Sequence, residues 1–238
     1  MQTLHHGLLL LHIFLGSLAL CLVWVPILSR KGGLNHRRFG RYYSLAMLAV
    51  GISGVVMSSL VLAWPTVIKA QAFASSEHPE ALLEMVQNMW SLLLLLSWLT
   101  VSGVIHGNWV LKYKHQRQKL RSWGWLVLPL GLAVGGLWVL KIALFSGSVL
   151  HVVFGSLALW SSFTMLRYVY RKEVTNTAWL LEHIAAMGGS AVGAYTAFFA
   201  FGGRHLLSFA SGYQLVFWIV PGIVGALLIQ RSSRKVTA

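Results

Sequence analysis

Four histidines lie inside apolar stretches of the sequence, where an ionisable side chain is costly. They are His12, His106, His151 and His183. Ionisable residues within a membrane usually face the interior of a helix bundle, and each is a candidate functional residue. An imidazole at such a position can bind a metal, exchange a proton or make a structural hydrogen bond.

Seven apolar segments, each near the roughly 20 residues that cross a bilayer, must position these histidines. They cover approximately residues 4–29, 43–68, 88–111, 123–142, 147–168, 178–202 and 213–230. The chain is 57% hydrophobic and only 10% charged, whereas a soluble domain carries about 25% charged residues. The sequence therefore predicts an all-α polytopic transmembrane bundle of about seven helices, with residues 1–238 as a single domain. In the polar stretch 69–87, Pro79 predicts the start of a short interfacial helix.

The basic residues lie almost entirely in the connections on one side of these segments. Of the 19 Lys and Arg, only Lys69, Lys141 and Arg204 fall on the other side. The positive-inside rule predicts a bacterial cytoplasmic membrane, with the N-terminus outside and the C-terminus in the cytoplasm. We therefore expect the basic residues to interact with the lipid bilayer, and we expect no binding of nucleic acid. The single cysteine, Cys21, excludes an intramolecular disulfide and an iron–sulfur cluster held by this chain alone.

The depths of the four histidines sort them into two pairs. His12 and His151 lie near the outer ends of the first and fifth segments. His106 and His183 lie near the inner ends of the third and sixth. Two histidines from facing helices at one depth can take both axial positions of a haem b iron. At 1.5 Å rise per residue, the two layers would lie roughly 15–20 Å apart along the membrane normal.

Small residues accompany these histidines at helical spacing, as a macrocycle between helices requires. Gly16 lies four residues after His12, and Gly155 lies four residues after His151. We predict two haem b groups, with His12 and His151 as ligands of the outer iron. The other pair would bind the inner iron. Two alternatives remain open: a site for another metal or a quinone, or histidines that form hydrogen bonds at small-residue helix contacts.

This ligand layout resembles that of the transmembrane di-haem b-type cytochromes of the ascorbate and ferric reductase type. The resemblance covers about four helices and does not extend to detailed sequence. It implies that electrons pass from one membrane face to the other through two haems, which would make the chain a transmembrane electron-transfer oxidoreductase. A quinol or a redox protein would then be the partner.

The segment His36-Arg37-Arg38-Phe39-Gly40-Arg41 is similar to the His-Arg-x-x-Gly-Arg signature of a bacterial family of multi-pass membrane proteins of unknown function. This resemblance covers mainly the first two apolar segments and implies no activity. Arg37 and Arg41 are expected either to anchor at the anionic inner leaflet or to pair with haem propionates. His36 itself is expected in a solvated cytoplasmic loop.

An internal similarity supports a different hypothesis. Residues 11–20 and 150–159 share seven of ten residues, including a His, a Gly and a Ser in register. This predicts a parallel repeat of the first two helices in the fifth and sixth, an architecture found among transporters. The alternative function is therefore a transporter or channel for a small solute or an ion. Such coupling usually relies on membrane carboxylates, and Glu182 is the one carboxylate inside a predicted segment.

Overall fold

The structure, a computed structural model, describes residues 1–203 and 214–237. In these residues the only regular elements are helices. Seven helices are long and apolar enough to cross a membrane: Gln2–Leu28, Leu34–Ala63, Pro79–Lys112, Trp123–Ser146, Val149–Tyr170, Ala178–Gly202 and Leu215–Val236. The prediction of an all-α polytopic bundle is confirmed, and the chain is a membrane protein suited to a lipid bilayer.

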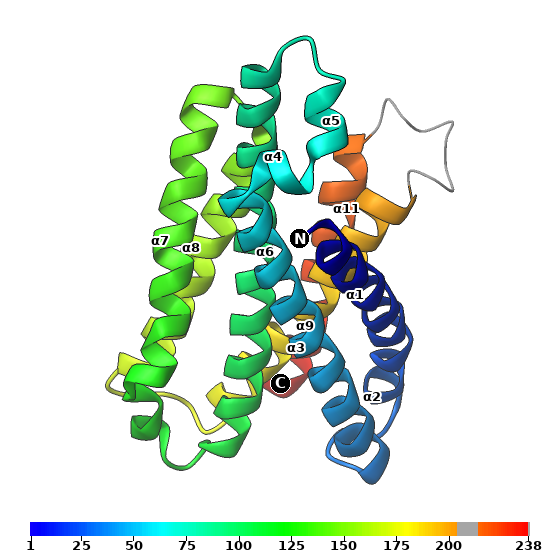
Figure 1. The fold of residues 1–238 in the computed structure, drawn as a ribbon. Helices are drawn as coiled ribbons and strands as arrows, with labels where there is room; N and C mark the ends of the chain where they lie inside the picture. Colours follow the sequence, from blue (N-terminus) through cyan, green and yellow to red (C-terminus); the bar gives the residue numbers. More distant parts are fainter. Residues whose placement is uncertain (204–213, 238) are drawn as a thin grey trace.

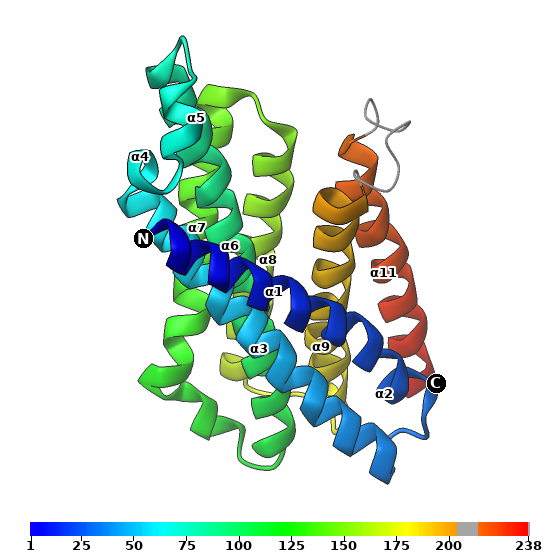
Figure 2. The same cartoon turned by 45° about the vertical axis from the view of Figure 1, so that its right-hand side comes forward.

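The elements follow one another as α1 (Gln2–Leu22), α2 (Trp24–Leu28), α3 (Leu34–Ala63), α4 (Pro65–Ile68), α5 (Ala70–Ala74), α6 (Pro79–Lys112), the 3₁₀ helix η1 (Arg117–Arg121), α7 (Trp123–Ser146), α8 (Val149–Tyr170), α9 (Ala178–Ala197), the π-helical segment η2 (Phe198–Gly203) and α11 (Gln214–Thr237). The long helices run between two ends of the bundle, where the connections gather (Figure 1). α1 is strongly tilted across the others (Figure 2).

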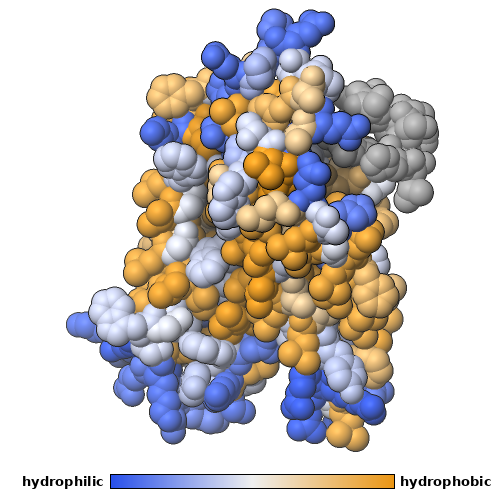
Figure 3. Space-filling model, in the orientation of Figure 1, coloured by the Kyte–Doolittle hydropathy of each residue, from blue (hydrophilic) through white to orange (hydrophobic). Residues whose placement is uncertain are grey.

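The two ends differ in their elements. One end carries the connections 29–33, 113–122 and 171–177, with the C-terminus towards it, and we call it the basic end. The opposite end carries α4, α5 and the connection between α7 and α8 (Figure 1). Hydrophilic residues gather at both ends, and a hydrophobic belt lies between them (Figure 3). This is the surface that a protein surrounded by hydrocarbon must present.

Two helices begin earlier than hydropathy predicts. α3 starts at Leu34 and not near residue 43, so His36 lies on its first turn and not in a loop. α6 starts at Pro79, which suits the first position of a helix because proline has no N–H to lose there. The expected separate interfacial helix is thus the first part of α6. A helix bonds its own backbone groups, so it can continue past the hydrocarbon into the polar boundary region.

α6 is the central helix of the bundle. It packs on α3, α7, α8 and α9, and it separates two groups of buried side chains. The first lies around α7 and α8 and includes Trp125 and Leu132. The second lies around α1, α3 and α9 and includes Ala19, Tyr43 and Met47. Side chains on opposite faces of α6 therefore enter different surroundings.

The packing does not repeat with the sequence similarity between residues 11–20 and 150–159. α1 packs along α3, whereas α8 packs along α7 and also on α6. The reason lies in the short connection between α7 and α8, where Gly147 adopts a φ of 64° and lets the chain reverse at once. The expected pairing of the fifth and sixth helices in the manner of the first two is therefore wrong.

Candidate functional site at the basic end of α6

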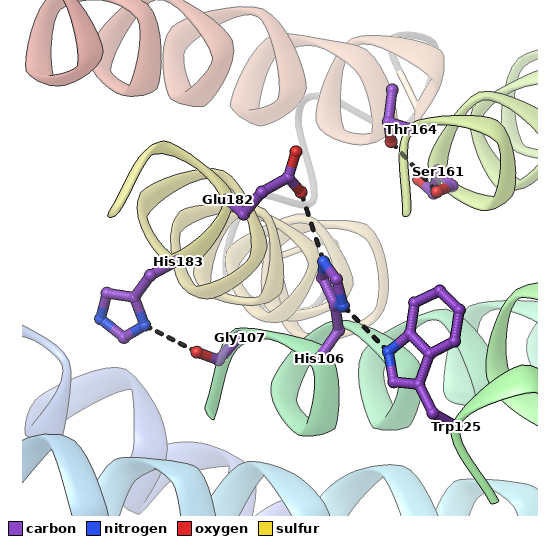
Figure 4. A network of polar contacts seen from close by, with 7 residues as sticks. All are labelled: His106, Gly107, Trp125, Ser161, Thr164, Glu182 and His183. Carbon is purple, nitrogen blue, oxygen red and sulfur yellow. Dashed lines mark hydrogen bonds and ion pairs between the residues drawn. The ribbon is translucent and has the colours of Figure 1, made fainter. Parts of the chain in front are cut away.

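A buried histidine forms the centre of a polar cluster in the part of α6 near the basic end. His106 is 1% exposed, and its Nε2 lies 3.3 Å from Oε2 of Glu182 on α9. Nε1 of Trp125 on α7 donates to Nδ1 of His106 at 3.2 Å. Side chains from two other helices, α7 and α9, thus contact one imidazole of α6 (Figure 4).

These contacts assign the tautomer of His106. An indole N–H can only donate, so Nδ1 must accept and carries no hydrogen. The imidazole hydrogen is then on Nε2 and points at Glu182, which accepts it as a carboxylate. A second proton cannot enter at Nδ1 while Trp125 occupies that position. The Nε2–H group of His106 and the Glu182 carboxyl therefore face each other directly.

An aromatic ring and a cation close the cluster towards the basic end. The Tyr168 ring on α8 meets the His106 ring edge-on, with 6.1 Å between centroids. The Arg117 guanidinium of η1 lies 5.8 Å from the centroid of the Tyr168 ring. Its Nη2 donates to the Arg171 carbonyl at 2.6 Å, while Nη1 is buried without a hydrogen-bond partner among the described residues. A fixed positive charge therefore lies between the cluster and the basic surface.

Polar groups continue along one face of α6 towards the opposite end. Residues 88, 91, 95, 98, 102 and 106 recur every three or four positions, which is the spacing of a single helix face. The buried Ser102 hydroxyl has no hydrogen-bond partner in the described part of the chain. Nearer the opposite end, Trp138 donates to the Ser91 hydroxyl at 3.5 Å. Leu95, 3% exposed, interrupts this face with an apolar side chain.

His183 does not join His106, although it follows Glu182 directly. Glu182 and His183 leave α9 in different directions, the first towards His106 and the second towards Gly107 (Figure 4). Nδ1 of His183 donates to the Gly107 carbonyl at 2.9 Å. A Cβ at Gly107 would lie 3.0 Å from Sδ of Met187, so α6 and α9 are in close contact here. The two histidines of the expected inner pair therefore have different partners, and α6 and α9 pack closely beside them.

The expected outer pair is not brought together either. Nδ1 of His12 donates to the Ser53 hydroxyl on α3 at 2.9 Å, and that hydroxyl donates in turn to a backbone carbonyl. Nε2 of His151 donates to the Asn88 carbonyl on α6 at 3.1 Å, and its Nδ1 accepts from Ser148 at 2.8 Å. α1 packs on α3 whereas α8 packs on α6 and α7, so the two imidazoles belong to different helix contacts.

The other residues predicted to bind haem lie apart from these histidines. A Cβ at Gly155 would lie 2.8 Å from Cγ of Leu140 and 3.1 Å from the Gly136 carbonyl. The absence of a side chain at Gly155 therefore allows α7 and α8 to pack closely. A Cβ at Gly16 would meet nothing within 4 Å. Arg37 and Arg41 are exposed on the first turns of α3. In the described residues, two haems held by the expected pairs therefore do not fit this packing.

Sequence analysis missed a histidine that the structure places near His183. His36 donates from Nδ1 to the Pro26 carbonyl at 2.9 Å, and the Lys31 ammonium caps the Ile27 carbonyl of the same short helix. Partial burial lowers the pKa of Lys31. The His36 imidazole lies within range of an electrostatic interaction with His183. The spacing of His36 and Tyr43, two helical turns apart, is the signal that could have placed both on one face of a longer α3.

Comparisons of the chain with protein-family models, curated proteins and solved structures find no match. Within residues 1–203 and 214–237, no group of three or more His, Cys, Asp or Glu side chains could hold a metal ion. Two surface hollows, one on α1 and α3 and one on α11, are open grooves that no histidine lines. The function must therefore be inferred from the chemistry of the buried cluster itself.

Proposed function

We propose that the protein is an ion transporter that moves protons across the membrane, with His106 and Glu182 as its proton-binding pair. The observation that carries this proposal is the 3.3 Å contact between a buried imidazole and a carboxylate from a neighbouring spanning helix. Ionisable groups paired inside a membrane typically mark proton relays in pumps and transporters. In the sequence, the argument against a transporter is that Glu182 is the one carboxylate inside a predicted segment. In the structure, His106 lies in contact with this carboxylate.

The pair holds one exchangeable proton. With Glu182 ionised, its carboxylate accepts the hydrogen on Nε2 of His106. A proton that arrives adds to Glu182, because Trp125 blocks Nδ1 of His106. The neutral carboxylic acid accepts the hydrogen bond from the imidazole less strongly than the carboxylate does. The contact that joins α6 to α9 therefore weakens. A carboxylate left unpaired in this partly buried position would be costly, so release of the proton restores the contact.

The polar face of α6 supplies a route on both sides of the pair. Towards the basic end, Tyr168 and the Arg117 guanidinium lie between His106 and the surface. Towards the opposite end, the unpartnered Ser102 hydroxyl lies one turn from His106 and can bind a water or pass a proton. Leu95 then forms an apolar barrier. A barrier within the route suits a transporter that opens transiently better than an open channel.

The orientation of the protein in the membrane is also part of this proposal. The basic end would lie in the cytoplasm of a bacterial cell, with the N-terminus outside the cytoplasmic membrane, because short basic connections are retained on that side. Protons would then enter from the end that carries α4 and α5 and reach Glu182 after crossing most of the membrane.

The electron-carrier hypothesis is a second proposal, in altered form. His183 favours it, because Nδ1 is held by a backbone carbonyl and Nε2 has no hydrogen-bond partner among the described residues. A metal-binding histidine is usually oriented in this way. A b-type electron carrier would need a ligand set other than the two pairs expected from depth, with a quinol or redox protein as its partner. An absorption spectrum of the purified protein tests it.

Proton flux into liposomes tests the leading proposal. Purified protein would be reconstituted with a pH-sensitive dye inside, and valinomycin with a potassium gradient would impose a membrane potential. We expect flux with the natural sequence and background flux with Glu182→Gln, because the amide cannot take up a proton. Glu84→Gln is the matched control, since it removes an exposed carboxylate near the start of α6. Flux that Glu182→Gln leaves unchanged, or no flux above empty liposomes, would contradict the proposal.

A further inference from the structure

Two histidines from different helices lie near the basic end. α3 and α9 both begin at this end, and the Tyr43 and Ser190 hydroxyls join them at 2.8 Å. His36 lies seven residues before Tyr43, and His183 lies seven residues before Ser190. Seven residues are about 10.5 Å of helix, so both histidines lie the same length of helix before this hydrogen bond. The two imidazoles are also within range of an electrostatic interaction.

Both imidazoles are oriented in the same way. Nδ1 of His36 donates to the Pro26 carbonyl and Nδ1 of His183 donates to the Gly107 carbonyl, each at 2.9 Å. A carbonyl can only accept, so Nδ1 carries the hydrogen and Nε2 keeps a free lone pair in both rings. Neither Nε2 has a hydrogen-bond partner in the described part of the chain. Histidine ligands of metals are typically held by this kind of hydrogen bond from the second ring nitrogen.

α3 and α9 do not pack directly on one another beside the pair. α3 and α9 each pack on neighbouring helices, and here they approach one another through long side chains such as Tyr43. Gly40 lies one turn after His36 on the same face of α3, and a Cβ there would meet nothing within 4 Å. The exposed Arg37 and Arg41 lie on the same turns of α3. Cations at this height suit the propionates of a bound porphyrin.

We propose that His36 and His183 are the two protein ligands of a metal centre at the basic end, and that the metal is a haem iron. The described residues contain no group of three ligands for a free ion, whereas a porphyrin supplies four ligands and leaves two positions for imidazoles. A single copper ion shares the same ligand chemistry. This site is separate from His106 and Glu182, and proton transport does not need it.

Absorption spectroscopy of the full-length protein tests the site. Protein would be purified from haem-supplemented cells, and colourless preparations would be titrated with haemin and, separately, with Cu(I). We expect about one low-spin haem per chain with two nitrogen ligands. His36→Ala and His183→Ala should each lose the low-spin spectrum, while His115→Ala, an exposed histidine at the same end, should keep it. Copper binding in place of haem, lost in the same two variants, would support the site and assign it to copper.

A methionine variant separates ligation from folding. His36→Met retains a ligand for iron, so a low-spin haem with a raised reduction potential is expected where the alanine variant gives none. Gel filtration would show whether each variant remains folded. Protein that binds neither haemin nor Cu(I) would overturn the proposal. So would a haem whose spectrum is unchanged in His36→Ala or in His183→Ala.

Discussion

The histidine buried near the basic end and the histidines farther from it look alike in sequence and differ in the structure. Near the basic end, His106 meets groups from two other helices and is buried at their junction. Farther from that end, His12 bonds to Ser53 on the adjacent helix, beside the middle of α6, and His151 bonds to Ser148 one turn earlier and to a carbonyl near the opposite end of α6. The basic end brings ionisable groups from different helices together, whereas His12 and His151 form hydrogen bonds to hydroxyls and to a carbonyl.

The difference shows that depth in the membrane and direction around a helix are separate properties. Sequence supplies the distance along a helix axis, at 1.5 Å per residue, and the depth follows from it only where the helix is upright. The tilt of α1 places His12 near Ser97, midway along α6, whereas His151 lies at Asn88. Direction depends on which neighbour each face meets, and successive residues are rotated by about 100°. Glu182 and His183 have nearly the same depth, yet one faces His106 and the other faces the Gly107 carbonyl.

The largest expected effect is loss of the buried imidazole. His106→Ala leaves the Glu182 carboxyl and the buried Trp125 N–H without their partner, and leaving a buried polar group unpaired costs about 1–3 kcal/mol. The lost ring adds a cavity to this cost. Thermal unfolding in detergent should show a large drop in Tm. His115→Ala, which removes an exposed histidine, should leave the Tm unchanged. Equal Tm values for the two variants would mean that the buried cluster does not stabilise the fold.

The two glycines that follow the outer histidines give a smaller, asymmetric effect. Gly155→Leu forces a side chain against Leu140 and the Gly136 carbonyl, and such overpacking costs about 1–3 kcal/mol. Gly16→Leu has open space and should be tolerated. Unfolding temperatures of the two variants would check this. Similar losses in both would indicate that the two positions have equivalent surroundings, as the sequence similarity suggests.

The smallest effect is expected at His12. Its imidazole makes one hydrogen bond, to Ser53, and is only half-buried, so His12→Ala should cost roughly 1 kcal/mol. His151→Ala removes a buried ring with two hydrogen bonds and should cost more. Proton flux should persist in His12→Ala. A proton flux abolished by His12→Ala would place His12 in the proton route. It would contradict the view that only the cluster near the basic end binds the transported proton.

Much of the fold could be predicted from sequence. All seven spanning helices follow from apolar length, because a helix in hydrocarbon must be long and apolar. The early start of α3 could not be predicted from hydropathy, because residues 34–42 are polar and lie beyond the apolar core. This error placed His36 in a loop and hid its relation to His183. A helical extension with arginines at the boundary produces the same composition as a basic loop.

The candidate site was predicted only in part. The level of His106 and the neighbouring helix α9 were expected, but the partner is Glu182 and not His183. Trp125 was not predicted as part of the site, because nothing in a single sequence links α7 to His106. Gly155, one of the small residues on which the haem prediction depends, allows close packing of α7 on α8.

The most direct test of the central claim is proton flux in a double-mutant cycle of His106→Gln and Glu182→Gln. If the two side chains bind one proton between them, each single variant should fall to background flux and the double variant should be no slower. Both glutamines retain hydrogen-bonding groups, and gel filtration would confirm that each variant is folded. Natural flux in either single variant, or a double variant much slower than both single variants, would show that His106 and Glu182 do not act as one proton-binding unit.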